Sequence, residues 1–251
     1  MNIMTNIIVL EDYMKKAFTL AEVLITLGII GVVAAITIPS LITKYQKKVI
    51  ETTLKEDYSI MAQVNRMMIA NEVDFDMSAA DGNDAAIQAW FKENMLPYMH
   101  VSSVCYNGKK GCWSNGYPTK TLNGSTFGDC RAGYGCGANW VSYIMNNGTK
   151  VALDIGNNSQ LKTIFGIDSE AETCLKIYVD VNGDKPPNKF GIDIYLMTFT
   201  DEGFVPAGVN KNMSQLKQSC SKGGNGYWCM TYVKNNGWKI SDEIWKLRKT
   251  K

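Results

Sequence analysis

The feature that most constrains this chain is an apolar run from Phe18 to Pro39, FTLAEVLITLGIIGVVAAITIP, which carries a single charge at Glu22. As a helix with a rise of about 1.5 Å per residue, the run would extend roughly 33 Å, and the hydrocarbon core of a bilayer is about 30 Å thick. A cleaved secretory signal has a shorter apolar part, and its small residues come after that part. Here the small residue, Ala17, comes first, so the run predicts a helix that stays in the membrane.

The residues at both ends of this run form a recognisable pattern: Lys15, Lys16, Ala17, Phe18, Glu22 and Pro39. In this combination the segment resembles the amino-terminal segment of type IV prepilins and type II secretion pseudopilins. Ala17 stands where that family usually has Gly, which exchanges one small residue for another. The resemblance covers only the start of the chain.

The resemblance implies that a membrane prepilin peptidase cuts between Ala17 and Phe18 and that the new amino group of Phe18 is methylated. The mature chain would then polymerise with copies of itself and with other pilins, and Pro39 would kink its helix. An inner-membrane platform protein and an assembly ATPase are further partners that the resemblance implies. Residues 1–17 would be the leader; a translation start at Met14 would shorten it to residues 14–17.

Glu22 needs a partner, because a carboxylate inside lipid costs about 2.5 to 3.5 kcal/mol even on lenient insertion scales. No Lys, Arg or His lies between Phe18 and Ile42, so this segment contains no partner. The resemblance supplies one, the free amino group of Phe18 on a neighbouring copy. The alternative is that Glu22 lies near the interface and extends toward the headgroups.

Beyond Pro39 the apolar residues recur every three or four positions, which predicts that the helix continues to about Glu72. The stripe consists of Ile50, Leu54, Tyr58, Met61, Val64 and Met68. We therefore expect a transmembrane and assembly helix over 18–42 and a globular domain outside the cytoplasm over 43–251, with 43–72 as its amphipathic helix. Lys15 and Lys16 precede the run and place the amino terminus in the cytoplasm by the positive-inside rule.

The rest of the chain predicts an antiparallel sheet. A loop is expected over 74–83, a short helix over 84–95, and an irregular, disulfide-held region over 101–137. Asn146-Asn147-Gly148 is a hairpin turn between strands 140–145 and 149–155. Further strands are expected at 174–181, 191–200, 204–205, 227–233 and 237–240. The fold class is α+β, a long amino-terminal helix packed on a carboxy-terminal antiparallel sheet, which agrees with the pilin resemblance.

All seven cysteines lie after residue 100, which is unusual for a reducing cytosol and typical of an exported, disulfide-bonded domain. The simplest local pairs are Cys105 with Cys112, Cys130 with Cys136, and Cys220 with Cys229, which leaves Cys174 free. Spacing alone does not decide between these and the other possible pairings.

One group of residues has the chemistry of a metal site. Asp180, Asn182 and Asp184 alternate as at the start of a calcium loop, and Asn188 and Asp193 follow. An EF-hand is excluded because Lys185 and Gly191 stand where it needs Gly and Glu. The resemblance favours calcium, since major pseudopilins carry a calcium site in a loop of the carboxy-terminal sheet. The alternative is a plain Asn-Gly turn before Pro186-Pro187.

The sequence contains no set of catalytic residues. His100 is the only histidine, so multi-His metal sites are excluded, and neither a phosphate-binding loop nor a dinucleotide fingerprint is present. We therefore expect a structural subunit of a type IV pilus-like or type II secretion filament and no enzyme. The alternative is a minor pilin that binds DNA or a surface through Lys109, Lys110, Lys120 and Arg131, although the net charge is only +2.

Overall fold

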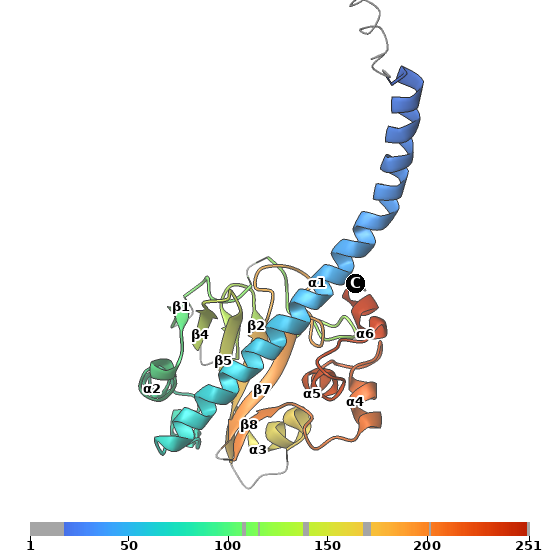
Figure 1. Ribbon diagram of the computed structural model, residues 1–251. Helices are drawn as coiled ribbons and strands as arrows, with labels where there is room; N and C mark the ends of the chain where they lie inside the picture. Colours follow the sequence, from blue (N-terminus) through green and yellow to red (C-terminus); the bar gives the residue numbers. More distant parts are fainter. Residues whose placement is uncertain are drawn as a thin grey trace, which may run out of the picture. The chain divides into compact units, whose positions relative to one another are not determined.

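The computed structural model describes residues 18–106, 109–114, 116–137, 141–167, 172–200 and 202–249 (Figure 1). The predicted leader and its last residue, Ala17, lie outside the described residues. The chain divides into two compact units, residues 1–46 and 47–251.

Helix α1, Leu20–Ala70, contributes to both units and includes Pro39. It begins at a capping box, in which the Glu22 backbone N–H donates to Thr19 Oγ1 (3.2 Å) and the Thr19 backbone N–H donates to Glu22 Oε2 (2.8 Å). The helix ends close to the predicted position, and Glu72 follows in the left-handed region with φ 55°. Five of the six predicted stripe residues are buried in the core, and Tyr58 is half-buried.

The second unit contains a six-stranded antiparallel sheet in the order β1-β4-β5-β6-β7-β8 (Figure 1). The strands are β1 Val101–Cys105, β4 Val141–Met145, β5 Lys150–Asn157, β6 Thr173–Asp180, β7 Ile194–Thr200 and β8 Gly203–Pro206. Leu153 is paired with Ile177, and Ile177 with Met197, which places their side chains on one face. The α+β prediction is confirmed, as are both central hairpins.

Shorter elements surround this sheet. They are η1 Ser78–Ala80, α2 Asp84–Trp90, η2 Phe91–Met95, η3 Leu96–Tyr98, β2 Cys130–Arg131, β3 Gly135–Cys136, α3 Asn158–Gln160, η4 Leu161–Phe165, α4 Met213–Ser219, α5 Cys229–Asn235, α6 Asp242–Lys246 and η5 Leu247–Lys249. The predicted helix over 84–95 is confirmed as α2 and η2. Asn83 caps it, with its side chain accepting a hydrogen bond from Ala86 N.

Two predictions about the sheet are wrong. Residues 101–105, expected to be irregular, form β1 because they pair with β4 at the sheet edge. Residues 227–233, expected to be a strand, lie mostly in helix α5, and 237–240 form no strand. A short apolar run is compatible with either a strand or a buried helix, and here Cys229, Met230 and Val233 share a helical face that enters the core.

Polar contacts fix the second half of α1 to the sheet. Asp57 is buried and accepts hydrogen bonds from Asn147 Nδ2 (2.7 Å) and Thr149 Oγ1 (2.8 Å) in the β4–β5 turn. Burial raises the pKa of Asp57 to about 6. Asn65 Nδ2 donates to the carbonyl of Thr200 at the end of β7 (3.2 Å). The helix is therefore attached to two separate parts of the sheet as well as packed on its face.

Three disulfides link residues that are close in sequence: Cys105–Cys112, Cys130–Cys136 and Cys220–Cys229. Cys174 is free and buried in β6. Burial raises the pKa of its thiol to about 11, so it is a poor nucleophile at neutral pH. Each disulfide therefore closes a short stretch of chain, and none of the three joins two strands of the six-stranded sheet.

Candidate functional site

The first candidate site is the amino-terminal part of α1. Helix α1 is long and apolar enough to cross a membrane, and among the described residues it is the one helix that is. Its apolar side chains from Leu20 to Ile42 are exposed, for example Leu24, Ile29 and Ile36. A continuous apolar surface of this size is not stable in water, so lipid or other protein chains must cover it.

Phe18 and Glu22 lie at the start of this surface. The Phe18 side chain is 83% exposed. The Glu22 carboxylate accepts hydrogen bonds from both the backbone N–H and the hydroxyl of Thr19, each at 2.8 Å. Glu22 therefore caps the helix within its own chain, a role that the sequence prediction missed although the Thr-x-x-Glu spacing signals it. The capping contacts leave the negative charge without a counter-charge in this segment, because residues 18–42 contain no Lys, Arg or His.

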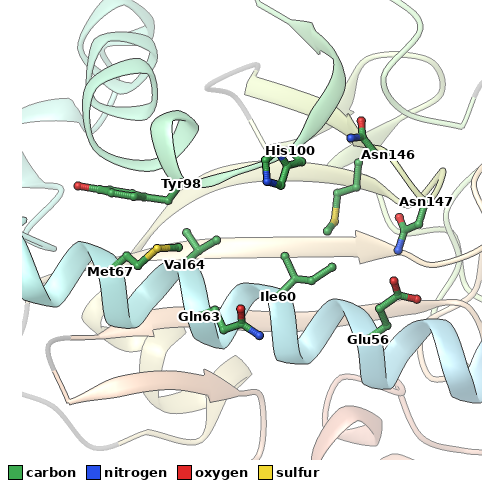
Figure 2. A pocket seen from close by; sticks show the side chains of 10 residues that line it. Glu56, Ile60, Gln63, Val64, Met67, Tyr98, His100, Asn146 and Asn147 are labelled. Carbon is green, nitrogen blue, oxygen red and sulfur yellow. The ribbon is translucent and has the colours of Figure 1, made fainter.

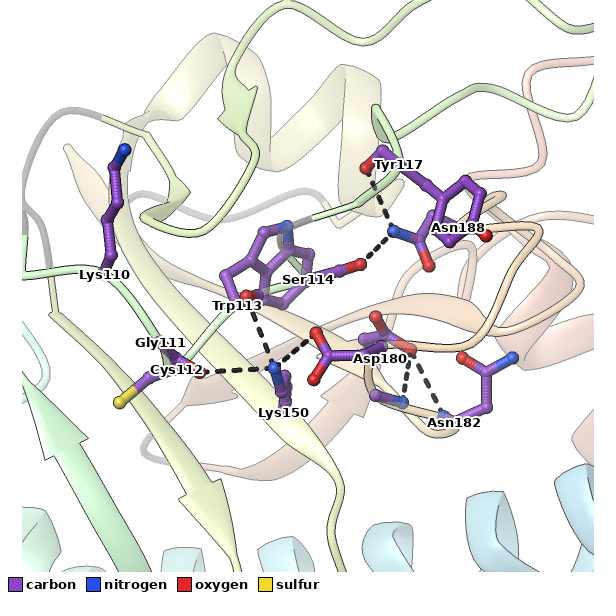
Figure 3. A network of polar contacts seen from close by, with 12 residues as sticks. Lys110, Gly111, Cys112, Trp113, Ser114, Tyr117, Lys150, Asp180, Asn182 and Asn188 are labelled. Carbon is purple, nitrogen blue, oxygen red and sulfur yellow. Dashed lines mark hydrogen bonds and ion pairs between the residues drawn. The ribbon is translucent and has the colours of Figure 1, made fainter.

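The second candidate site is the β6–β7 loop, residues 181–193, which folds around two buried carboxylates, Asp180 and Asp193. Figure 3 shows the part of this loop around Asp180. Asp180 Oδ1 accepts hydrogen bonds from the backbone N–H groups of Asn182 (3.2 Å) and Gly183 (3.1 Å). The Asp193 carboxylate accepts from the backbone of Lys189 (2.6 Å) and Asn188 (3.0 Å), and from Asn182 Nδ2 (3.0 Å). Both acids therefore organise the backbone of the loop.

The electrostatics of this loop favour a positively charged ligand. Burial, together with repulsion from Asp193, raises the pKa of Asp180 well above its usual range, and burial raises the pKa of Asp193 to about 7. Three buried oxygens have no hydrogen-bond donor among the described residues: Asp180 Oδ2, Asn182 Oδ1 and Asn188 Oδ1. Each unpaired buried acceptor costs about 1 to 3 kcal/mol. Carboxylate and amide oxygens are ligands that calcium prefers, so the donor set fits calcium.

Asp184, also predicted as a ligand, has a different partner. Its side chain is 65% exposed and its Oδ1 lies 2.7 Å from Lys150 Nζ. Lys150 also donates to the carbonyls of Gly111 (3.2 Å) and Trp113 (3.4 Å), as Figure 3 shows. Asp184 is therefore paired with a lysine, and its exposed carboxylate is not among the buried oxygens that lack donors. Lys150 also stabilises the charged form of Asp180, so a cation would add to a positive charge that is already nearby.

Asn188 connects this loop to the segment after β1. Its side-chain amide donates to Ser114 Oγ (2.6 Å) and to the carbonyl of Tyr117 (3.1 Å) (Figure 3). Only Asp180 and Asp193 are buried acids here, and across the described residues no cluster of three or more His, Cys, Asp or Glu side chains is placed to hold a metal. A cation bound here would therefore need neutral oxygen ligands besides the two carboxylates. Asn188, which the sequence suggested as a further ligand, can supply one, because its Oδ1 has no donor among the described residues.

His100 lies on the rim of a pocket of about 280 Å³ between α1 and the ends of β1 and β4 (Figure 2). Ile60, Val64 and Met145 supply much of its apolar lining, and Glu56 is the acid in it. His100 has no hydrogen bond to a nucleophile or to an acid among the described contacts, so the pocket offers no catalytic relay.

The basic residues predicted for DNA binding do not form a uniformly positive surface. Arg131 lines a second pocket of about 660 Å³ that also contains Asp81, Asp129 and Asp154. Lys110 lies over the ring of Tyr134, with its Nζ 5.0 Å from the ring centroid. Acidic groups beside Arg131 would repel phosphates, so this face is poorly suited to a nucleic-acid backbone.

Comparison with known proteins identifies the start of the chain. A family model of the prokaryotic N-terminal methylation motif matches residues 13–38, which include Ala17, Phe18 and Glu22. This motif is the prepilin signal of type IV pilins and pseudopilins, so the resemblance predicted from the sequence is confirmed for this segment. No curated protein and no solved structure gives a significant match.

Proposed function

We propose that this protein is a structural subunit of a type IV pilus-like or type II secretion filament. The observation that carries the proposal is the methylation motif at residues 13–38, which continues into an exposed apolar helix and then into a disulfide-bonded α+β domain. In the filament the apolar halves of α1 would pack together. The carboxylate of Glu22 would neutralise the methylated amino group of Phe18 on a neighbouring copy.

Before assembly, the chain would span the cytoplasmic membrane once, with its globular domain outside the cytoplasm. Basic residues lie on both sides of the apolar run, with Lys15 and Lys16 before it and Lys44, Lys47 and Lys48 after it. The positive-inside rule therefore does not decide the orientation of the helix by itself. The disulfides are stronger support for a globular domain outside the cytoplasm, because disulfides form and persist in oxidising compartments.

The proposed partners follow from the energetics of assembly. Moving an apolar helix out of the bilayer requires work, and the sequence has no nucleotide-binding loop to supply it. A separate assembly ATPase and a membrane platform protein would do so, and a prepilin peptidase would remove residues 1–17. The second candidate, a minor pilin that displays a binding surface, differs from the first in copy number: it would be rare in purified filaments.

Processing at Phe18 tests the main proposal. We expect mass spectrometry of the assembled protein to find a mature amino terminus at Phe18 with one added methyl group. Ala17→Gly should be processed at least as fast as the parent chain, whereas Ala17→Leu, with a bulky side chain at the cleavage position, should accumulate as precursor. Assembled protein that retains Lys15 and Lys16 would contradict the proposal.

We also propose that the β6–β7 loop binds calcium through Asp180, Asn182, Asn188 and Asp193. The bound cation would neutralise two buried carboxylates and supply a partner for three oxygens that otherwise lack one. In this role calcium stabilises the domain and takes no part in a reaction.

Thermal unfolding of the full chain in detergent tests the calcium proposal. Because a ligand at 100 times its Kd adds about 2.7 kcal/mol to stability, saturating calcium should raise Tm by several degrees over the same protein in chelator. Asp180→Asn should abolish this gain without lowering the calcium-free Tm, since it removes one of two like charges and keeps the oxygen that accepts from Asn182 and Gly183. Asp184→Asn is the matched control and should keep the gain. Equal Tm values for the parent chain in calcium and in chelator would refute the proposal.

A further inference from the structure

Six basic residues from two distant parts of the sequence gather at one place in the globular unit. Lys47 and Lys48 lie on α1, and four more lie in the last part of the chain: Lys239, Lys246, Arg248 and Lys249. We call this set the basic collar. Its two halves are about 190 residues apart in sequence, so only the tertiary structure brings them together.

Specific contacts fix the two halves of the collar to each other. Lys47 Nζ lies 2.6 Å from Asp242 Oδ1 at the start of α6, and the buried carboxylate of Glu51 accepts a hydrogen bond from the backbone N–H of Ile240 (3.0 Å). Lys239 Nζ lies 3.9 Å from the other oxygen of Glu51. Ile50, Ile244 and Trp245 belong to the same buried cluster beneath these contacts. Helix α6 therefore lies beside the α1 turn that starts at Lys47 (Figure 1).

The collar carries more positive charge than the protein as a whole. Its six cations are accompanied by three acids, Glu51, Asp242 and Glu243, whereas the entire chain has a formal net charge of +2. Lys48, Lys239, Lys246 and Lys249 are exposed. The formal charges of the rest of the chain therefore sum to a slightly negative value, so the collar carries the excess of positive charge.

The position of the collar along the chain relates it to the membrane. Ile42 is the last residue of the predicted membrane segment, and Lys47 follows only five residues later in the sequence, so a chain that spans the bilayer keeps Lys47 near its surface. The headgroup layer on each side of a bilayer is roughly 5 to 8 Å thick. We propose that the basic collar binds the anionic phospholipid headgroups of the membrane that the chain spans, and thereby holds the domain against the bilayer until the subunit is extracted. This inference rests on the proposed membrane anchoring.

One residue at the collar has an unused donor that suits a phosphate. Trp245 is 6% exposed, and its indole N–H has no acceptor among the described residues. The Arg248 guanidinium lies over the same ring at 4.8 Å and donates to the Trp245 carbonyl (2.8 Å). Arg248 is thus held in place with its charge beside the indole ring, and a phosphate bound by its guanidinium would lie next to this indole.

The test uses the mature full chain reconstituted in vesicles of phosphatidylcholine, with or without 30% phosphatidylglycerol. Lysines are acetylated with an uncharged, amine-reactive reagent, and the rate at each lysine is measured by mass spectrometry. Because each basic residue near an anionic surface is stabilised by about 1 kcal/mol, we expect Lys239, Lys246 and Lys249 to react about five-fold more slowly in the anionic vesicles. The effect should disappear in 0.5 M salt, where screening acts within roughly 4 to 5 Å. Exposed Lys217 and Lys222, in and just after α4, are internal references.

A pair of double variants separates collar binding from general effects of a charged surface. Lys246→Gln with Lys249→Gln should restore fast labelling of Lys239 in the same anionic vesicles, whereas Lys217→Gln with Lys222→Gln should not change it. Equal labelling of the collar in both kinds of vesicle, or slowing of the reference lysines to the same extent, would overturn the proposal. Flotation with the vesicles at alkaline pH is measured first, and a chain that does not float would refute the membrane anchoring and this inference together.

Discussion

Glu22→Ala should abolish filament assembly while leaving membrane insertion and processing intact. Insertion of the single helix should be unharmed or improved, since the substitution removes a charge that costs about 2.5 to 3.5 kcal/mol in lipid. In the filament, the amino group of Phe18 on the neighbouring copy would lose its partner inside an apolar core. Breaking a buried charge pair costs about 3 to 5 kcal/mol, which corresponds to at least a hundred-fold loss of assembled subunits. The measurement is the amount of sheared filament relative to the membrane pool.

The capping box at the start of α1 makes a control necessary, because Glu22→Ala also removes the contacts to Thr19. Glu22→Gln keeps an oxygen that accepts from the Thr19 N–H, since Gln is a normal member of a capping box, but it has no charge. Thr19→Ala removes the cap and keeps the charge, at a cost of about 1 kcal/mol to the helix. If charge pairing drives assembly, both Glu22 variants fail and Thr19→Ala still assembles. Normal assembly of Glu22→Gln would show that Glu22 acts only as a cap.

Reduction of the three disulfides should have the second large effect and should unfold much of the globular domain. The linked cysteines are 7, 6 and 9 residues apart. Closing loops of this length stabilises a protein by about 2 to 3 kcal/mol each in the chain-entropy model, and the net stability of a whole domain is about 5 to 15 kcal/mol. Circular dichroism with and without a phosphine reductant should show a Tm lower by at least ten degrees, or loss of the cooperative transition.

Alkylation counts the bridges independently of stability. Protein denatured without reductant should take up one alkyl group, at Cys174, and protein denatured with reductant should take up seven. Cys174→Ala is the matched control, because it removes the free thiol and leaves all three bridges; its unfolding should remain as sensitive to reductant as that of the parent. Seven reactive thiols in unreduced protein would contradict the disulfide assignment.

The sequence alone determined the parts of this protein that depend on local pattern. The motif at residues 13–38 and the apolar run of α1 were readable because membrane insertion and helix periodicity depend on neighbouring residues. The hairpin at Asn146-Asn147-Gly148 was readable for the same reason, since a turn depends on a few adjacent residues and Gly148 adopts a positive φ of 90°. Each disulfide joins two cysteines that are close in sequence, so these pairs were also the simplest ones to predict.

Only the tertiary structure decided the features that depend on residues far apart in sequence. Residues 101–105 become a strand because β4 pairs with them, and residues 229–235 become a helix because one face of it enters the core. Asp184, predicted as a ligand, pairs instead with Lys150, which lies 34 residues earlier in the sequence. Asn188 becomes the better candidate ligand because its buried Oδ1 has no donor among the described residues. The basic collar exists because Asp242 and Ile240 contact α1 at Lys47 and Glu51. Each of these outcomes was set by packing and by the need to pair buried polar groups, which no local pattern records.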